Sequence, residues 1–562
     1  MNNFNVIDIE EDEFTSFYSD KMKKIKQNKF EKMEPVENEI NKVYDIILKY
    51  IKEKKRKIYG GYAWNKLFTN KNKNYAIYDE YDVPDIDFYS PEPMTDLIAL
   101  CDTLHEAGFK YIDGKEAQHG ETYSIFVNFQ LYCEMSYMPK NIYSKVRFLQ
   151  IDGLNITHPW FMMIDFFRML TDPMLSWWRF EKHFERYLKL QKLYPLPKTN
   201  KPLSIEKYDD KSIDKTIMKI LDLITEKDNV IVTGFYAYNY YVYLTKEKGS
   251  DKYINIPYVE AYTDEYNKDG MDFIEKIKSL SDKITHKEFY PFFQFYEYNC
   301  VFYYEDIPIF YLYSNSKKCL PYKQVEYVKF ENKKATSTKQ TINIGSFDFN
   351  ILQALVILVK VRVDDDSDWN DVLYKLVNGF VNLRNLYLKQ NKLKSYDDSI
   401  VGSFVTDCIG KTITPERERG LLIHSRKKKR KTLVIRYTPG DKEKSNNLSS
   451  YMFPNSSGNK ITNERNQKLN HQQNIDSDDE SDDDDSINDN KSDYSNHSDY
   501  SNKSNKNNKS NKNNKNNKNN KNNNNNKKSN NSEKDLEDIN DTNEDPDIAE
   551  LLNTGNIMKD DM

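Results

Sequence analysis

The chain has 562 residues, room for roughly three to five domains, and it is rich in aromatic residues, with 42 Tyr and 29 Phe. Residues 441–562 carry a charge of −8 and residues 1–440 carry +3, of a total of −5. No run approaches the ~20 apolar residues of a membrane helix, and the N-terminus does not read as a signal peptide. The five cysteines are scattered and odd in number, which argues against a disulfide framework and favours a reducing compartment.

The predicted elements begin with a polar arm over residues 1–35, which we expect to be loose or to form short helices. Apolar residues recur at helical spacing through Val36–Ile58 and predict an amphipathic helix, which leads into the pair Gly60-Gly61. Apolar and polar residues alternate over Val83–Tyr89 and predict a strand. The next predicted elements are a helix at Met94–Gly108, one or two strands in Thr122–Glu134, and helices at Pro159–Leu170 and Pro173–Leu190.

The C-terminal part of the chain has a different composition. An acidic block at Asp476–Asp485 precedes Asn/Lys/Ser repeats at Ser501–Ser532. Such sequence cannot bury enough apolar surface to offset chain entropy, so we expect a disordered tail over residues 439–562. The tail is either a tolerated low-complexity extension or a segment that tethers or regulates binding.

An internal repeat occupies the body of the chain. Its three matched blocks are GGYAWN (Gly60–Asn65) with GFYAYN (Gly234–Asn239), VPDIDFYS (Val83–Ser90) with IPYVEAYT (Ile256–Thr263), and YCEMSYMPK (Tyr132–Lys140) with IFYLYSNSK (Ile309–Lys317). An apolar helix follows in each copy, at Pro159–Leu170 and at Phe347–Val361. The common order predicts a duplicated domain, against the alternative of chance resemblance in a Tyr/Asn-rich chain.

The copies differ where chemistry would occur. Asp85 and Asp87 of copy one become Tyr258 and Glu260, Gly61 becomes Phe235, and Glu134 becomes an aromatic residue, roughly Phe310. Copy two therefore keeps the apolar pattern and loses the polar residues. We expect one working domain beside one degenerate copy.

Asp85 and Asp87 are alternate residues of a predicted strand, so both carboxylates face one side. Two carboxylates this close are tolerated in water or around a divalent cation, and oxygen ligands favour Mg²⁺ or Mn²⁺. Glu134, at the end of another predicted strand, is the candidate third ligand, and three carboxylates can hold two ions. A solvated strand end is the alternative for the aspartate pair alone.

The Gly60-Gly61 pair precedes a helix-like segment, where glycines and free N–H groups suit a phosphate, although an ordinary turn is the alternative. Lys182 and Arg186 are candidates for contact with β- and γ-phosphates, and Lys66 is a further one; solvated basic faces are the alternative. Of the adjacent Trp177 and Trp178, we expect one to be buried in the core.

The order of glycine pair, Asp-x-Asp strand and third carboxylate resembles the palm of polymerase-β-like nucleotidyltransferases. The segments that narrow the resemblance are GGYAWNKLF, YDVPDIDFYSPEP, YCEMSYMPK and FRMLTDPMLSWWRFEKHFER. Over residues 36–435 they resemble the poly(A) polymerase catalytic subunits of large cytoplasmic DNA viruses, chiefly those of giant amoebal viruses and more distantly those of poxviruses.

The resemblance implies an α+β fold with a helical N-terminal region and two nucleotidyltransferase-like palm domains. The catalytic domain would span residues 36–200 and the inactive one residues 201–438. Asp85, Asp87 and Glu134 would be the metal ligands, Glu134 standing where the superfamily commonly has Asp. The RNA 3′-hydroxyl would attack the α-phosphorus of ATP, with two Mg²⁺ or Mn²⁺ ions as cofactors.

Expected partners are single-stranded RNA and ATP, with a homodimer or a processivity subunit by family analogy and no membrane. The basic run Arg426–Lys431 predicts a patch that binds the phosphate backbone of RNA. A nuclear-import-like signal and a solvated surface are the alternatives. The expected location is the host cytoplasm, with packaging in the virion as an addition. The alternatives are another template-independent nucleotidyltransferase, such as an oligoadenylate-synthase-like or uridylyl enzyme, and an inactive RNA-binding scaffold.

Overall fold

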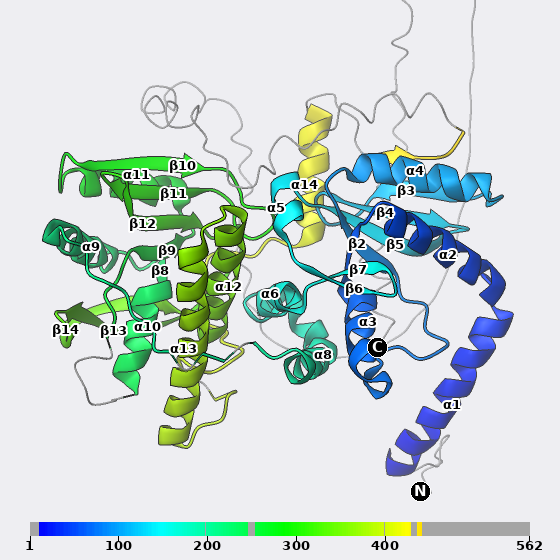
Figure 1. Ribbon diagram of the computed structural model, residues 1–562, viewed down its shortest axis with the longest axis horizontal. Helices are drawn as coiled ribbons and strands as arrows, with labels where there is room; N and C mark the ends of the chain where they lie inside the picture. The colour runs from blue at the N-terminus through cyan, green and yellow to red at the C-terminus, as the bar shows by residue number, and fades with distance from the viewer. Residues whose placement is uncertain are drawn as a thin grey trace, which may run out of the picture. The chain divides into compact units, whose positions relative to one another are not determined.

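Two mixed β-sheets with attached helices form the described part of the chain (Figure 1). The computed structural model describes residues 11–196, 198–199, 201–245, 253–397, 399–428 and 435–440. Within these ranges, no helix combines the length and the apolar character needed to cross a bilayer. Of the tail predicted to be disordered, residues 439–562, Pro439 and Gly440 form a turn and residues 441–562 lie outside the described residues.

The first half of the chain contributes one sheet and most of the helices around it. Its helices are α1 (Glu11–Lys32), α2 (Glu37–Glu53), α3 (Gly60–Lys71), η1 (Lys73–Tyr75), α4 (Pro93–Glu106), α5 (Lys140–Lys145), α6 (Pro159–Leu170), α7 (Pro173–Ser176), η2 (Trp177–Arg179) and α8 (Phe180–Leu193). Its strands are β1 (Lys57–Tyr59), β2 (Ile86–Ser90), β3 (Ile112–Glu116), β4 (Thr122–Val127), β5 (Gln130–Tyr137), β6 (Phe148–Ile151) and β7 (Leu154–Thr157).

The second half repeats this plan. Its helices are α9 (Lys211–Ile224), α10 (Gly234–Leu244), α11 (Tyr266–Lys278), α12 (Phe347–Val363), α13 (Ser367–Asn391) and α14 (Pro415–Lys428). Its strands are β8 (Val230–Thr233), β9 (Val259–Thr263), β10 (Ile284–Phe289), β11 (Asn299–Tyr304), β12 (Ile307–Ser314), β13 (Leu320–Glu331), β14 (Lys334–Gly345), β15 (Cys408–Ile409) and β16 (Arg436–Tyr437).

The N-terminal elements differ from the sequence prediction in two ways. One continuous helix, α1, occupies Glu11–Lys32 in place of the loose arm or short helices that we expected. The helix predicted to reach Ile58 ends at Glu53, because Lys55 has a φ of +54° and Lys57–Tyr59 then forms β1. A left-handed residue cannot continue an α-helix. The glycine pair therefore follows a strand directly.

Strand pairing in the two sheets confirms the internal repeat. The first sheet has the order β16-β3-β4-β5-β2-β1-β7-β6 and the second β10-β11-β12-β9-β8-β14-β13-β15. Without β16 in the first sheet and β15 in the second, the two orders correspond strand by strand. The corresponding central pairs are parallel (β5 with β2, β12 with β9), and the pairs next to them are antiparallel (β2 with β1, β9 with β8). The α+β fold with two palm-like sheets is thus confirmed.

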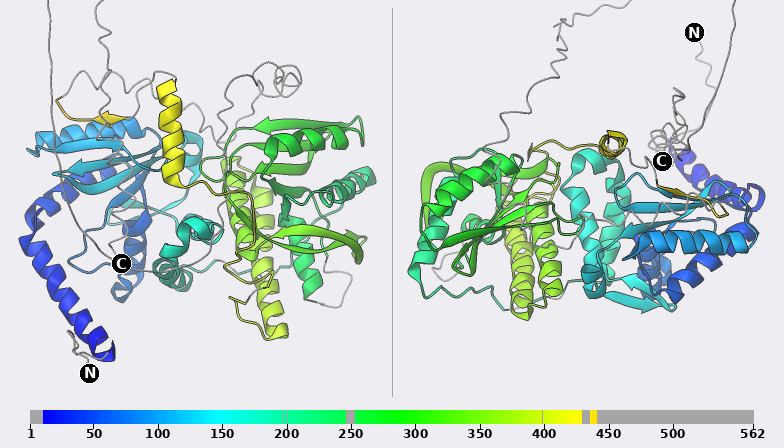
Figure 2. Two further views of the ribbon diagram at one scale, coloured as in Figure 1. Left: turned by 180° about the vertical axis from the view of Figure 1, so that it is seen from behind. Right: turned by 90° about the horizontal axis from the view of Figure 1, so that it is seen from above.

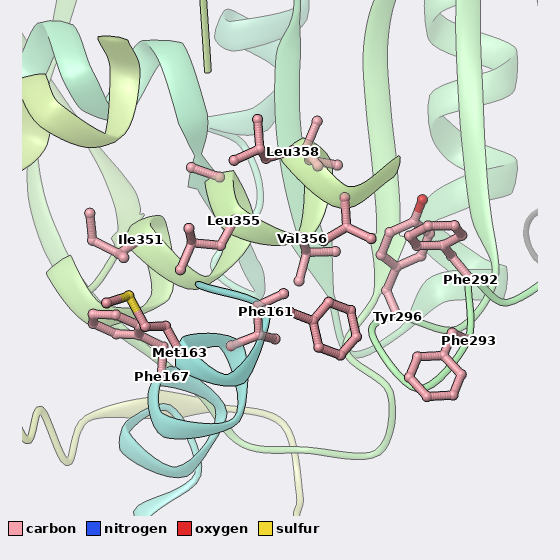
Figure 3. Packing of buried hydrophobic residues seen from close by; sticks show 14 of the residues in the cluster. Phe161, Met163, Phe167, Phe292, Phe293, Tyr296, Ile351, Leu355, Val356 and Leu358 are labelled. Carbon is pink, nitrogen blue, oxygen red and sulfur yellow. The ribbon is translucent and has the colours of Figure 1, made fainter. Parts of the chain in front are cut away.

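Helices α6 and α12, one from each half, pack against each other. Figure 3 shows the side chains at this contact, which come from α6 (Phe161, Met163, Phe167) and from α12 (Ile351, Leu355, Val356, Leu358), with Phe292, Phe293 and Tyr296 alongside. The ring of Phe293 also lies 5.9 Å from that of Tyr89 in β2. The second half therefore packs next to the strand that carries Asp87.

The C-terminal described segment returns to the first sheet, as the yellow α14 and β16 in Figure 2 show. Strand β16 pairs with β3, and Glu116 of β3 forms ion pairs of 2.7 Å with both Arg419 and Arg426 of α14. Arg426 is therefore engaged in a structural ion pair, whereas Lys427 and Lys428 are exposed and residues 429–431 lie outside the described residues, so the phosphate-backbone patch stays a prediction. The limits 36–200 and 201–438 stay predictions.

One disulfide departs from the cysteine prediction. Cys319 at the start of β13 is bonded to Cys408 of β15, which lies 89 residues further along the chain. The other three cysteines are free and buried. Sequence spacing could not reveal the pair because β13 and β15 become neighbours only in the folded sheet.

Candidate active site

Three carboxylates meet where β2 and β5 run side by side. Asp87 is the register partner of Glu134 across this parallel pair, and of Tyr59 across the antiparallel pair with β1. Asp85 precedes β2 by one residue, and the hydroxyl of Tyr44 in α2 donates to the carbonyl of the preceding Pro84. One ligand oxygen from each of Asp85, Asp87 and Glu134 lies within 4.8 Å of the others. The structure thus brings the three predicted acids together.

Burial and mutual repulsion dominate the electrostatics of this triad. Burial, with the charges of Asp85 and Glu134, raises the pKa of Asp87 well above its usual range. Burial also raises the pKa of Asp85 and that of Glu134, although Ser124 donates a 2.6 Å hydrogen bond to Glu134 Oε1. Three like charges held together at half-buried positions are unfavourable without a compensating cation.

The donor set fits a hard divalent cation. It consists of carboxylate oxygens alone, which suit Mg²⁺ or Mn²⁺ better than metals that prefer nitrogen or sulfur. It is also the only cluster of three or more His, Cys, Asp or Glu ligands within reach of one ion among the described residues. A bound cation would relieve the mutual repulsion of the three carboxylates.

The glycine turn between β1 and α3 touches the triad. Gly60 has a φ of +69°, and a Cβ placed on it would lie 1.9 Å from Oδ2 of Asp87. A Cβ on Gly61 would lie 2.1 Å from the hydroxyl of Tyr78. A side chain at position 60 would thus need both a strained backbone and a shift of Asp87, and one at position 61 would displace the Tyr78 hydroxyl. The N-terminus of α3 begins beside the carboxylates. Contact of this turn with a phosphate stays a prediction.

The predicted cations separate into two groups. Lys182 and Arg186 of α8, together with Arg179 of η2, act to lower the pKa of Asp85, so their charges face the triad. Arg186 also donates to the hydroxyl of Tyr78 at 3.4 Å. Lys66, in contrast, forms a 2.8 Å ion pair with Asp152. The first group is placed to meet an anion at the triad, and Lys66 is engaged elsewhere.

Both halves of the chain match known proteins of one family. A family model described as "Poly(A) polymerase catalytic subunit" matches residues 45–176, and one described as "APMV, Putative poly(A) polymerase, catalytic subunit, C-terminal" matches residues 189–471. The "Putative poly(A) polymerase catalytic subunit" of Acanthamoeba polyphaga mimivirus is 33% identical over 450 residues, which cover 75% of this chain and 76% of that protein.

The chain belongs to the poly(A) polymerase catalytic subunit family. The protein of the same name from African swine fever virus (isolate Pig/Kenya/KEN-50/1950) is 31% identical over 165 residues, 28% of this chain and 34% of that protein. The crystal structure of the Megavirus polyadenylate synthase matches with a TM-score of 0.75 and 31% identity, over 82% of this chain and 94% of that one.

The second copy of this poly(A) polymerase family chain has kept the turn and lost the triad. Gly234 again has a φ of +69°, and its Cβ would lie 2.0 Å from Oε2 of Glu260. Strand register places Tyr311, and not the predicted Phe310, opposite Glu260 where copy one has Glu134. Glu260 accepts a 3.2 Å hydrogen bond from Gln353, and its neighbour Tyr258 contacts the ring of Tyr311. Copy two thus offers one carboxylate at the three positions.

Sequence reasoning left three residues of the site without a role. Tyr78 lies against Gly61, and Ser124 donates a hydrogen bond to Glu134. Burial lowers the pKa of Arg179, and the negative charges of the three acids act against this shift. Tyr78 and Ser124 belong to no motif, so nothing in the sequence marks them. Arg179 could have been chosen from its spacing to Lys182 and Arg186.

Proposed function

We propose that this chain adds adenylate residues from ATP to the 3′-hydroxyl of RNA at the site formed by Asp85, Asp87 and Glu134. The observation that carries the proposal is the meeting of these three carboxylates on adjoining strands, in a chain of the poly(A) polymerase catalytic subunit family. The acids would hold Mg²⁺ or Mn²⁺, two ions being the number that three bridging carboxylates accommodate.

The residues of the chain then have distinct tasks. The carboxylates hold the cations, whose chemistry when bound is to activate the attacking hydroxyl and to stabilise the departing pyrophosphate. The Gly60-Gly61 turn leaves room for a phosphate to approach the N–H groups at the start of α3. Such positioning and electrostatic stabilisation supply most of the catalysis in phosphoryl transfer.

Cations on η2 and α8 bind the triphosphate in this proposal. Arg179, Lys182 and Arg186 all act on Asp85 electrostatically, so their positive charges lie close enough to the triad to attract the negative β- and γ-phosphates of ATP. Arg186 is buried and donates to Tyr78, which fixes its position. Lys66 has a lesser part because its ion pair with Asp152 would have to open first.

The substrates of the chain follow from the proposed reaction. Single-stranded RNA and ATP are the substrates, and a second copy of the chain or a processivity subunit would keep the RNA bound between additions. Action in the host cytoplasm, with packaging in the virion, stays a prediction.

A primer-extension assay tests the substrate and the metal together. Purified full-length chain, an RNA with a free 3′-hydroxyl and Mg²⁺ or Mn²⁺ are mixed with each nucleoside triphosphate separately. We expect extension with ATP that stops when EDTA is added, because the triad needs its cation. Extension with UTP would keep the reaction class and contradict adenylate addition. Bound RNA with no extension would favour a scaffold or a missing subunit.

A further inference from the structure

Two tryptophans beside the triad are exposed to solvent. Trp177 is 65% and Trp178 45% exposed, which contradicts the expectation that one of them lies in the core. The helix predicted over Pro173–Leu190 is interrupted here by the 3₁₀ turn η2, which contains both tryptophans. Adjacent exposed tryptophans are typical of binding surfaces.

The two rings and Met174, which is 56% exposed in the short helix before the turn, form a small exposed apolar patch over residues 174–178. Trp178 is held in its orientation by a 3.1 Å hydrogen bond from its Nε1 to the carbonyl of Leu175. The ring therefore stands in a defined position.

Arg179 joins this patch to the catalytic carboxylates. Its guanidinium lies 4.3 Å from the ring centroid of Trp178 on one side, and its charge acts on Asp85, Asp87 and Glu134 on the other. Lys182, one turn further along, also acts on Asp85. The patch thus combines aromatic faces with positive charge next to the reacting centre, as surfaces that bind single-stranded nucleic acid do.

We propose that Trp177 and Trp178 stack the last bases of the RNA primer and so deliver its 3′-hydroxyl to the triad. This inference rests on the proposed function. The neighbouring cations favour a polyanion over an apolar protein partner. A single adenine of ATP can contact only one of two rings that project from consecutive residues, whereas successive bases of a strand can contact both. Stacking does not depend on sequence, which suits an enzyme that extends any 3′ end.

The test measures RNA affinity without catalysis. A 5′-labelled single-stranded RNA of about 12 nucleotides is titrated with full-length chain, and its anisotropy is recorded in the absence of ATP. The variants are Trp177→Ala/Trp178→Ala, the conservative Trp177→Phe/Trp178→Phe, and the control Phe129→Ala. Phe129 is 81% exposed in the β4–β5 turn and stacks on Tyr111, away from η2 in the sequence.

We expect the alanine pair to weaken RNA binding by about tenfold or more, since stacking contributes ~1–3 kcal/mol per base and ~1.4 kcal/mol is tenfold. The phenylalanine pair should retain most of the affinity, and Phe129→Ala should match the wild type. In primer extension the alanine pair should raise KM for RNA and leave KM for ATP within about twofold of wild type.

Three results would overturn the inference. Unchanged RNA affinity in the alanine pair would remove the stacking surface. A raised KM for ATP alone would assign the rings to the nucleotide, and altered self-association with unaltered RNA affinity would assign them to a second copy of the chain. Wild-type protein that binds RNA and fails to extend it with ATP would instead contradict adenylate addition by this chain acting alone, so the two failures are distinguishable.

Discussion

Gly60 and Gly234 show what a single residue contributes to each copy. Both have a φ of +69°, and both lie where a Cβ would meet the carboxylate on the neighbouring strand, Asp87 in one copy and Glu260 in the other. The same backbone turn therefore lies against one acid of the triad in the first copy and against one isolated acid in the second. The pair allows backbone strain to be separated from displacement of a triad ligand.

We predict that Gly60→Ala and Gly234→Ala destabilise the chain by similar amounts, ~1–3 kcal/mol, because each forces a non-glycine residue to positive φ. Only Gly60→Ala should lower primer extension, by about a hundredfold, since it displaces the carboxylate of Asp87. Urea denaturation measures the first effect, and extension rates measure the second. Equal losses of extension in the two variants would show that strain alone, and not the position of Asp87, controls activity.

At the scale of elements, β9 and α12 bury one carboxylate, Glu260, whose neighbours at the other two triad positions are Tyr258 and Tyr311. Burial raises the pKa of Glu260 from 4.5 to about 7, and the hydrogen bond from Gln353 of α12 acts weakly against this shift. A raised pKa in the folded state means that the protonated acid stabilises the fold below about pH 4.5. That contribution is lost as the pH rises through about 7, where the buried group ionises.

We therefore predict that Glu260→Gln increases the free energy of unfolding more at pH 8 than at pH 5, by on the order of 2 to 3 kcal/mol. The glutamine keeps the shape of the side chain and cannot ionise. Urea titrations of wild type and variant at the two pH values isolate this residue, because all other groups contribute to both proteins. A difference between variant and wild type that is the same at both pH values would contradict the account.

Other elements show where sequence patterns are insufficient. Periodicity predicted α6 with its observed bounds and α4 to within two residues, because a buried face and proline or glycine signals mark their ends. It missed β1, a three-residue strand, and the break between α7 and α8. Short strands and 3₁₀ turns are set by neighbours that the local sequence does not contain.

For the whole molecule, the duplication was predictable because both copies retain the apolar residues of the same strands. The three acids were predictable because alternation along one strand and a third carboxylate on another imply a shared face. Tyr78, Ser124 and the pair Cys319–Cys408 were not, since each reaches its position through tertiary contacts between distant segments. The matched blocks Tyr132–Lys140 and Ile309–Lys317 already place Tyr311 opposite Glu134, in agreement with the strand register, so the prediction of Phe310 was wrong by one residue.

The two halves also provide an internal control for the central claim, because Asp87 and Glu260 occupy equivalent positions beside Gly60 and Gly234. They differ in their surroundings: Asp87 lies within a cluster of acids, and Glu260 lies among aromatic side chains and Gln353. Removing the charge of each therefore asks whether the cluster, and not the fold, performs the reaction.

The most direct measurement compares primer extension with ATP by Asp87→Asn and Glu260→Gln, each checked by its thermal melting temperature. We predict that Asp87→Asn loses more than about a hundredfold in rate, because it removes a ligand of the cation. Glu260→Gln should extend RNA within about twofold of wild type. An Asp87→Asn chain that extends RNA as fast as the wild type would contradict the assignment of the active site.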